Sequence, residues 1–380
     1  MSISSKLPAV GLTIFTEMTN LANAHGAINL SQGFPEFDPH PALQELVLKH
    51  MRAGRNQYAP MQGVLALRER ISAKVRDLYH APYDPATEIT ITAGATEALF
   101  AAITAVVHPG EEVIILEPAY DCYLPMVSLS GGRPVFVPLH YPSYRIDWQA
   151  FQHSITPRTR LAILNFPHNP SGSVIDPRDL DRLAEILRGT RVLLLSDEVY
   201  EHIVFDGRAH CSLAGHPELR ERTFVVSSFA KTCHATGWKV GYCLAPRPLS
   251  AELQKIHQYL VFSVNTPMQH AFADFLQNPG PISALAAHYQ SLRDFFLGRI
   301  AGSRFRPLPC HGTFFLMLAY DAISDEPDVA FARRLTREHG VAAIPPSVFY
   351  HNGEDHRVLR FCFAKTHATL AEAAERLCRI

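Results

Sequence analysis

Long hydrophobic runs are missing from this chain of 380 residues. Residues 1–8 contain no apolar stretch of signal-peptide length, and the longest apolar runs elsewhere, such as residues 192–195, are only as long as a strand. We therefore expect a protein that is neither exported nor embedded in a membrane.

Cysteines are few and scattered. The seven cysteines form no Cys-x-x-Cys pair and no cluster with histidine at the spacing of a zinc site. The sequence therefore predicts no metal site. An odd number of scattered thiols fits a reducing compartment, so we expect the protein in the cytoplasm.

Runs of basic residues are also absent. The chain has 35 lysines and arginines against 36 acidic residues, which gives a formal net charge of -1 at pH 7. This balance argues against a nucleic acid or an anionic membrane as partner. The chain has no internal repeat and no low-complexity tract, and its length predicts one large domain with a smaller companion.

Short β-rich runs alternate with helical patterns through the middle of the chain. This alternation predicts the α/β class, with a largely parallel sheet covered by helices. The expected strands are residues 88–92, 112–116, 161–165, 192–196, 223–227 and 240–245. The expected helices between the first four are residues 96–107, 120–130 and 178–188.

A change of domain is expected near residue 280. The turn sequence Asn278-Pro279-Gly280-Pro281 precedes a long helical pattern over residues 282–301. We expect residues 41–280 to form the large domain. The smaller α+β domain would combine residues 1–40 and 281–380, with strands near residues 313–318, 341–344 and 358–361.

Polar residues follow the ends of several predicted strands. Asn165 ends one strand, Asp197 and Ser228 follow two others, and Gly94 joins the first strand to its helix. Ligands of open parallel sheets bind beyond the carboxyl ends of the strands, where such residues meet. The sequence therefore predicts a ligand site at this edge of the sheet.

One lysine lies among these residues, and it indicates a cofactor. A lysine amine, a buried carboxylate, a phenol and an amide are the groups that pyridoxal phosphate requires. Lys231 would bond to the cofactor, Asp197 would hold its ring nitrogen protonated, and Tyr200 and Asn169 would hydrogen-bond its ring oxygen. Most of the six other lysines lie in charged, exposed-looking helical contexts. Each residue also has an ordinary explanation: a surface loop for Lys231, a helix N-cap for Asp197 and a proline-rich turn for Asn169. The prediction therefore depends on the whole set.

Small residues at a helix start favour the cofactor's phosphate. Gly94-Ala95-Thr96 would offer unpaired backbone N–H groups and the positive end of the helix dipole. Ser228 would add a hydroxyl and Lys239 a positive charge. An ordinary helix cap and a surface lysine are the alternatives. Tyr120 is a candidate to stack on the pyridine ring, although a core tyrosine is common at such a place.

Seven motifs along essentially the whole chain resemble those of the fold type I, class I/II aminotransferases that use pyridoxal phosphate. The resemblance is strongest to the methionine aminotransferases and the related kynurenine/glutamine aminotransferases. The motifs are Asn29-Leu30-Ser31-Gln32-Gly33-Phe34-Pro35, Asn56-Gln57-Tyr58-Ala59-Pro60, Thr92-Ala93-Gly94-Ala95-Thr96-Glu97-Ala98, Pro167-His168-Asn169-Pro170-Ser171-Gly172, Ser196-Asp197-Glu198-Val199-Tyr200-Glu201-His202, Ser228-Phe229-Ala230-Lys231-Thr232 and Thr236-Gly237-Trp238-Lys239-Val240-Gly241-Tyr242.

This resemblance implies roles for five further residues. The proteins of this family are homodimers with sites at the subunit interface, so Tyr58 would reach the cofactor phosphate of the neighbouring chain. Arg360 would clamp the substrate α-carboxylate, with Gly33 against the same group. An arginine in an apolar strand needs such a partner to offset desolvation. Phe15 and Phe262 would line the pocket for the substrate side chain, part of which comes from the other subunit.

The implied reaction moves the amino group of a neutral amino acid to a 2-oxo acid by ping-pong kinetics. The expected donors are methionine, aromatic amino acids, leucine and glutamine. Phe15 and Ser263 stand where kynurenine aminotransferases tend to carry tryptophan and histidine, which argues against kynurenine itself. A β-lyase, for example one that cleaves cysteine conjugates, would keep all the same site residues. A non-catalytic regulator is the remaining alternative, and it would be expected to carry a DNA-binding module.

Overall fold

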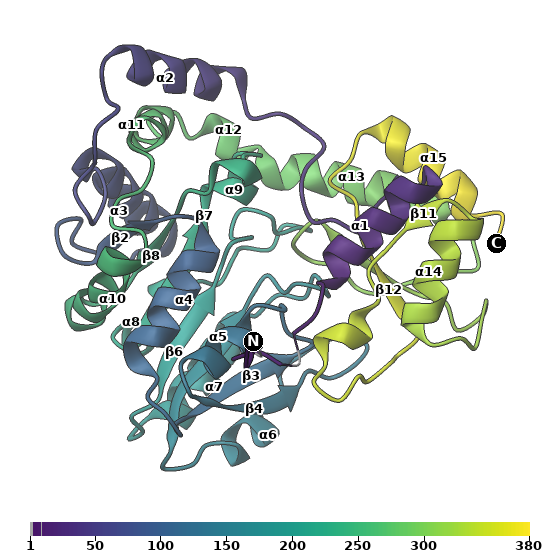
Figure 1. Cartoon of the computed structure of the whole chain (residues 1–380), viewed down its shortest axis with the longest axis horizontal. Coiled ribbons are helices and arrows are strands. Elements are labelled where there is room, and N and C mark those ends of the chain that lie inside the picture. The colour runs from purple at the N-terminus through teal and green to yellow at the C-terminus, as the bar shows by residue number, and fades with distance from the viewer. Residues whose placement is uncertain (1–2, 9) are drawn as a thin grey trace.

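A seven-stranded sheet forms the centre of the computed structural model, which describes residues 3–8 and 10–380 (Figure 1). Every neighbouring pair of strands is parallel except the two pairs that involve β8. The predicted α/β class with a mostly parallel sheet is confirmed. The strands, in spatial order, are β2 (Ile89–Thr92), β8 (Gly241–Leu244), β7 (Thr223–Ser228), β6 (Leu193–Asp197), β5 (Thr159–Asn165), β3 (Glu112–Glu117) and β4 (Arg133–Pro138).

The central strands are apolar on both faces. In β3, Val113 and Ile115 belong to one hydrophobic core, whereas Ile114 and Leu116 belong to the core on the other side of the sheet. Successive side chains of a strand point to opposite faces, so a continuous apolar run requires a cover on each face.

Helices provide both covers. One core contains side chains of α4 (Ala95–Val106), α5 (Tyr123–Leu129) and α10 (Arg247–Leu260). The opposite core contains side chains of α2 (Pro41–Arg52), α3 (Leu65–Tyr79), α6 (Trp148–His153), α7 (Pro177–Leu187) and α11 (Thr266–Phe275). Short helices near the sheet are η1 (Leu213–Gly215), α8 (Pro217–Arg220), α9 (Phe229–Thr232) and η2 (Thr236–Trp238).

A second group of elements has its own hydrophobic core, and Figure 1 shows it gathered at one end of the molecule. It contains a three-stranded antiparallel sheet, β12-β10-β9, and a parallel pair, β1 and β11. Its strands are β1 (Ile28–Asn29), β9 (Arg306–Pro307), β10 (Phe315–Ala319), β11 (Val341–Ala342) and β12 (Val358–Cys362). Its helices are α1 (Ile14–His25), α13 (Leu285–Ile300), α14 (Asp328–Glu338), η3 (Pro346–Phe349) and α15 (His367–Leu377). The short helix α12 (Gly280–Ser283) precedes α13 and has no buried residue.

Three local features differ from the sequence predictions. Strand β4 was not predicted, because prolines stand second and last in its six residues and leave an apolar run of only three. The helix expected over residues 282–301 is divided at Ala284 into α12 and α13. The helix expected from residue 120 begins at Tyr123. Among the helices of the described residues, none has the length and apolar composition needed to cross a membrane.

Candidate active site

A cavity of about 360 Å³ opens at the carboxyl ends of the sheet strands. It is lined by residues from both groups of elements. The structure brings to it thirteen of the predicted site residues: Phe15, Gly33, Gly94, Ala95, Thr96, Tyr120, Asn169, Asp197, Tyr200, Ser228, Lys231, Lys239 and Arg360.

Lys231 extends from α9 into this cavity. Its ammonium donates a hydrogen bond to the carbonyl oxygen of Gly33 over 2.8 Å, and it lies 5.6 Å from the ring centre of Phe314. Burial lowers the pKa of Lys231 to about 8, and the nearby cations Arg360 and Lys239 act in the same direction. A fraction of this amine is therefore unprotonated near neutral pH, as a nucleophile or base requires.

Gly33 must lack a side chain for this contact to form. A Cβ at this position would lie 2.7 Å from the Cζ atom of Phe315, which is closer than two carbon atoms can pack. The backbone of Gly33 therefore approaches the aromatic wall of the cavity closely, and its carbonyl reaches Lys231.

Asp197 is the last residue of β6 and is 3% exposed. Its Oδ2 atom accepts a hydrogen bond from the hydroxyl of Tyr123 over 2.7 Å, and its Oδ1 atom accepts one from the backbone N–H of Val199 over 3.3 Å. Burial raises the pKa of Asp197 to about 6, although both hydrogen bonds and Lys231 oppose this shift. A cationic group beside Asp197 would favour its ionised form further.

Asn169 links the cavity to two neighbouring residues. Its Oδ1 atom accepts a hydrogen bond from Arg360, and its backbone N–H donates to Asn165 Oδ1 over 3.0 Å. The amide of Asn165 in turn donates to the backbone oxygen of Asp197. Because the side-chain oxygen of Asn169 already accepts from Arg360, the side-chain NH2 group is the part left to bind a ligand, and it does so as a donor. Tyr200 is 3% exposed and its ring packs edge-on against Phe314.

The start of α4 forms a cradle for an anion. Gly94 has a φ of 79°, a value that favours glycine, and precedes the first helical N–H groups, which have no partner within the helix. The ammonium of Lys239 lies 3.3 Å from the place where a Cβ of Gly94 would be. Ala95, Thr96 and Ser228 also line the cavity. This donor set suits a phosphate.

Arg360 lies on β12 and is 1% exposed. Its guanidinium donates to Asn169 Oδ1 over 2.8 Å and to the carbonyl oxygen of Ser31 over 2.7 Å. The Cζ atom lies 4.0 Å from the ring centre of Phe315 and 5.2 Å from that of Phe15. Burial lowers the pKa of Arg360 to about 10, so it remains a cation at neutral pH. Its buried Nε atom has no hydrogen-bond partner among the described residues, and a bound carboxylate would supply one.

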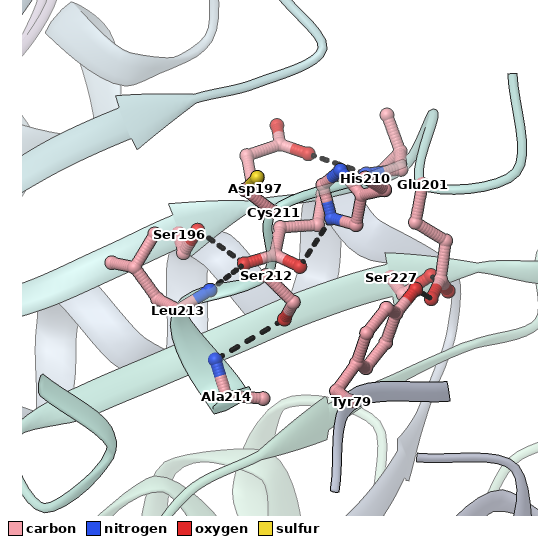
Figure 2. A network of polar contacts seen from close by, with 12 residues as sticks. Tyr79, Ser196, Asp197, Glu201, His210, Cys211, Ser212, Leu213, Ala214 and Ser227 are labelled. Carbon is pink, nitrogen blue, oxygen red and sulfur yellow. Dashed lines mark hydrogen bonds and ion pairs between the residues drawn. The ribbon is translucent and has the colours of Figure 1, made fainter. Parts of the chain in front are cut away.

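A network of buried polar side chains adjoins the cavity (Figure 2). Burial raises the pKa of the Glu201 carboxyl, but the Lys74 ammonium and the hydrogen bonds bring it well below its usual range. Most of the other lysines were expected in exposed-looking helical contexts, and Lys74 is an exception, since its side chain is 14% exposed. Glu201 accepts hydrogen bonds from four side chains: Lys74 (2.7 Å), Tyr79 (2.6 Å), Tyr242 (2.8 Å) and Ser227.

A second buried glutamate is held next to Asp197. Glu198 accepts hydrogen bonds from the hydroxyl of Ser196 over 2.7 Å and from the backbone N–H of Leu213 over 3.1 Å. It also pairs with His210 at 2.8 Å. Glu198 follows Asp197 and Glu201 follows Tyr200, so the hydrogen bonds of these two glutamates hold the turn that carries both site residues.

Comparisons with known proteins agree with this geometry. The family model for aminotransferase class I and II matches residues 25–377. Methionine aminotransferase of Escherichia coli is 53% identical over 98% of this chain and 97% of its own length. Kynurenine–oxoglutarate transaminase of Dictyostelium discoideum is 33% identical over 99% of this chain and 96% of its own.

A solved structure is equally similar. YbdL from Escherichia coli, for which a methionine aminotransferase function is described, superimposes with a TM-score of 0.98 and 52% identity, and covers 100% of both chains. The chain belongs to the class I and II aminotransferases. The predicted family, fold type and dependence on pyridoxal phosphate are thereby confirmed.

The cavity of this aminotransferase fits pyridoxal phosphate by the chemistry of its donors. The amine of Lys231 has a lowered pKa, Asp197 is a buried acid, and the α4 cradle offers N–H groups and a cation to a phosphate. No cluster of three or more histidine, cysteine, aspartate or glutamate side chains suited to a metal ion occurs within residues 3–8 and 10–380.

Two predicted residues of the aminotransferase lie outside the cavity. Tyr58 is 81% exposed and Phe262 is 46% exposed, and their rings contact each other edge-on at 5.3 Å between centres. Neither lines the cavity of its own chain. The predicted roles of both involve the other subunit, so a single chain does not test them.

The cavity and its surroundings also contain residues that the sequence reasoning missed. Gln32, Phe34 and Phe315 line the cavity, and Tyr123 contacts Asp197. Phe34 lies within one of the seven motifs and could have been found there. Phe315 and Tyr123 carry no local signal, because they look like ordinary core aromatic residues.

Proposed function

We propose that the residues around the cavity have the following roles. Lys231 bonds to the cofactor, Asp197 holds its ring nitrogen protonated, and Tyr200 and Asn169 donate to its ring oxygen. Tyr120 stacks on the ring. The observation that carries this proposal is the meeting of a lysine of lowered pKa, a buried acid and an anion cradle in one cavity.

We propose that Arg360 binds the substrate α-carboxylate at its unpaired Nε edge, with the backbone of Gly33 alongside. When bound, pyridoxal phosphate supplies an aldehyde that bonds amines reversibly and a ring that accepts electron density from the substrate. The Lys231 amine would take up the proton from the substrate α-carbon and hold it for delivery later in the amino transfer. Asp197 keeps a proton on the ring nitrogen throughout, and the aromatic wall around Phe315 limits water at the reacting atoms.

The amino donors that we propose are neutral, with methionine and aromatic amino acids foremost. Phe15, Phe34 and Tyr120 line the cavity, and the thioether of methionine packs well against aromatic rings. Apart from Lys231, Lys239 and Arg360, the residues that line the cavity carry no positive charge for a second substrate carboxylate. The similarity to methionine aminotransferase of Escherichia coli supports the same preference.

We propose a homodimer in which Tyr58 completes the phosphate site of the partner chain. Its high exposure and its contact with Phe262 support a covered position in the assembly. We also propose residues 41–280 as the large domain and residues 1–40 with 281–380 as the small one, which the separate hydrophobic cores support. The free thiols of all seven cysteines support a cytoplasmic location.

A panel of amino donors and 2-oxo acid acceptors tests the proposal. The purified holoenzyme should convert methionine and aromatic donors to their oxo acids, with aspartate and glutamate much slower. Formation of pyruvate and ammonia from a β-substituted donor, without amino transfer, would indicate a β-lyase instead. A preference for acidic donors would contradict the proposed substrate class.

A further inference from the structure

Among residues 3–8 and 10–380, one side chain is hydrogen-bonded to Asp197, and it comes from helix α5. The Tyr123 hydroxyl donates to Oδ2 over 2.7 Å, whereas the backbone N–H of Val199 is 3.3 Å from Oδ1. A 2.7 Å bond from a hydroxyl to a carboxylate oxygen is strong and directional. Oδ1, with its longer contact, is the oxygen better able to accept a further N–H group.

Tyr123 is held firmly in this position. It is 2% exposed, it is the first residue of α5, and its backbone N–H donates to the carbonyl oxygen of Tyr120 over 3.2 Å. The two tyrosine rings pack edge-on with centres 5.8 Å apart. One short segment therefore carries both the tyrosine that lines the cavity and the tyrosine that contacts Asp197.

We propose that Tyr123 is a positioning residue that keeps Asp197 ionised and directs its Oδ1 atom toward the ring nitrogen of bound pyridoxal phosphate. This inference rests on the role proposed above for Asp197. A phenol that donates to a carboxylate stabilises the charged form, and a buried carboxylate needs such a partner to remain ionised.

The other ionisable groups near Asp197 do not replace this contact. Glu198 on the same turn favours protonation of Asp197, and Lys231 from α9 favours ionisation but contributes less than Tyr123. Burial raises the pKa of Tyr120, Cys122 and Tyr200, so these groups stay neutral near pH 7. Tyr123 is therefore the main side chain that opposes the effect of burial on Asp197.

The test compares Tyr123→Phe with the unchanged enzyme by the dissociation constant of pyridoxal phosphate across a range of pH. Loss of the hydrogen bond raises the pKa of Asp197. As the pH falls, Asp197 therefore becomes protonated at a higher pH in the variant than in the unchanged enzyme, and the ring nitrogen loses its charged partner. We expect binding about tenfold weaker near about pH 6 and a smaller loss, from the less well directed Oδ1 atom, above about pH 8, where Asp197 is ionised in both proteins. A structural role alone would weaken binding by the same factor at every pH, and that result would overturn the inference.

Tyr83→Phe is the matched control. The Tyr83 hydroxyl is also buried but has no hydrogen-bond partner within the part of the chain that the structure describes. Its removal should leave cofactor binding unchanged at every pH. A shift equal to that of Tyr123→Phe would show that the effect is not specific to Asp197 and would overturn the inference.

Asp197→Ala separates this inference from the assignment on which it rests. If Asp197 holds the ring nitrogen, Asp197→Ala weakens cofactor binding, and Tyr123→Phe then has no further pH-dependent effect in that background. Unchanged binding in Asp197→Ala would overturn the role of Asp197 itself. Weaker binding in Asp197→Ala, with the full effect of Tyr123→Phe retained, would overturn only the role of Tyr123.

Discussion

Lys231 shows how its surroundings change one side chain. A free lysine has a pKa of about 10.4, whereas that of Lys231 is lowered to about 8, mainly by burial and also by the charges of Arg360 and Lys239. The same amine can therefore bond to an aldehyde and later act as a base near neutral pH. A lysine at the surface could do neither as readily.

The lowered pKa leads to a measurable pH dependence. In the apoenzyme, acylation of Lys231 by an amine-selective reagent should rise with pH and reach half its maximum at about pH 8, because only the neutral amine reacts. Peptide mapping by mass spectrometry measures the reaction at this residue. The variant Lys239→Met should move the midpoint upward, since it removes a neighbouring cation. A midpoint near about pH 10.4 in the unchanged protein would contradict the described environment.

Most of the site residues could be predicted from the sequence, but a few could not. Asn165, Asp197 and Ser228 end strands of one parallel sheet, so their meeting at one edge followed from the topology. Tyr123 and Lys74 were not foreseen, because a helical pattern does not reveal which distant carboxylate a polar group will meet.

At the scale of elements, one carboxylate ties together the structures around the cavity. Glu201 receives hydrogen bonds from α3, β7 and β8, and it directly follows Tyr200. Ser227 contacts Glu201, whereas Ser228 lines the cavity, because neighbouring strand residues face opposite ways. The network thus connects the packing of the sheet to the position of the site.

Removal of this charge should destabilise the protein strongly. Glu201→Gln leaves the ammonium of Lys74 buried without its ionic partner, so we expect a loss of about 3–5 kcal/mol in the free energy of unfolding. Addition of Lys74→Met to this variant should restore part of the loss. Denaturant unfolding measures both changes.

Glu112→Gln is the control for the Glu201 variant. Glu112 is also a buried carboxylate of the sheet, but its partner Arg158 is 64% exposed, so we expect a loss of about 1 kcal/mol or less from the ion pair. Equal losses of unfolding free energy in the two variants would contradict the expectation that the buried Glu201 pair matters more to stability than the Glu112 pair, whose arginine is exposed.

Expectations about elements held where the apolar pattern was strong. The predicted bounds of the central strands agree with the structure within a few residues. A short apolar run between two helical patterns is best explained as a buried strand. The antiparallel direction of β8 was not foreseen, since the apolar pattern of a strand is the same in either direction. The division between α12 and α13 was missed because Ala284 carries no signal for a break.

At the scale of the whole molecule, the proposed dimer accounts for the residues that the single chain leaves exposed. Tyr58 and Phe262 lie outside the cavity of their own chain, although the family resemblance places both at the site. A partner chain that covers them would resolve this difference.

Mixed dimers test the role of Tyr58. Tyr58→Phe alone should weaken binding of pyridoxal phosphate about tenfold, because a hydrogen bond to the phosphate is lost. A dimer of one Tyr58→Phe chain and one Lys231→Ala chain should contain one intact site, made of Lys231 from one chain and Tyr58 from the other. Its tight binding of one cofactor per dimer would support the proposal.

A mixed dimer of Arg360→Ala and Lys231→Ala chains provides the control for this experiment. Arg360 and Lys231 line the same cavity of one chain, so this pairing should also assemble one site with Lys231, but that site lacks Arg360 and should not turn over. Turnover is therefore the measurement that compares the two pairings. Turnover in neither pairing would contradict the role of Tyr58 in the partner's site, and turnover in both would contradict the role of Arg360.

All the proposed roles depend on a bond between Lys231 and pyridoxal phosphate in the cavity at the edge of the sheet. Borohydride reduction of the holoenzyme, followed by peptide mapping, tests it most directly, because reduction makes the bond between amine and cofactor permanent. We predict one modified lysine, Lys231, and no such adduct in Lys231→Ala. An adduct on another lysine such as Lys239, or no adduct at all, would contradict it.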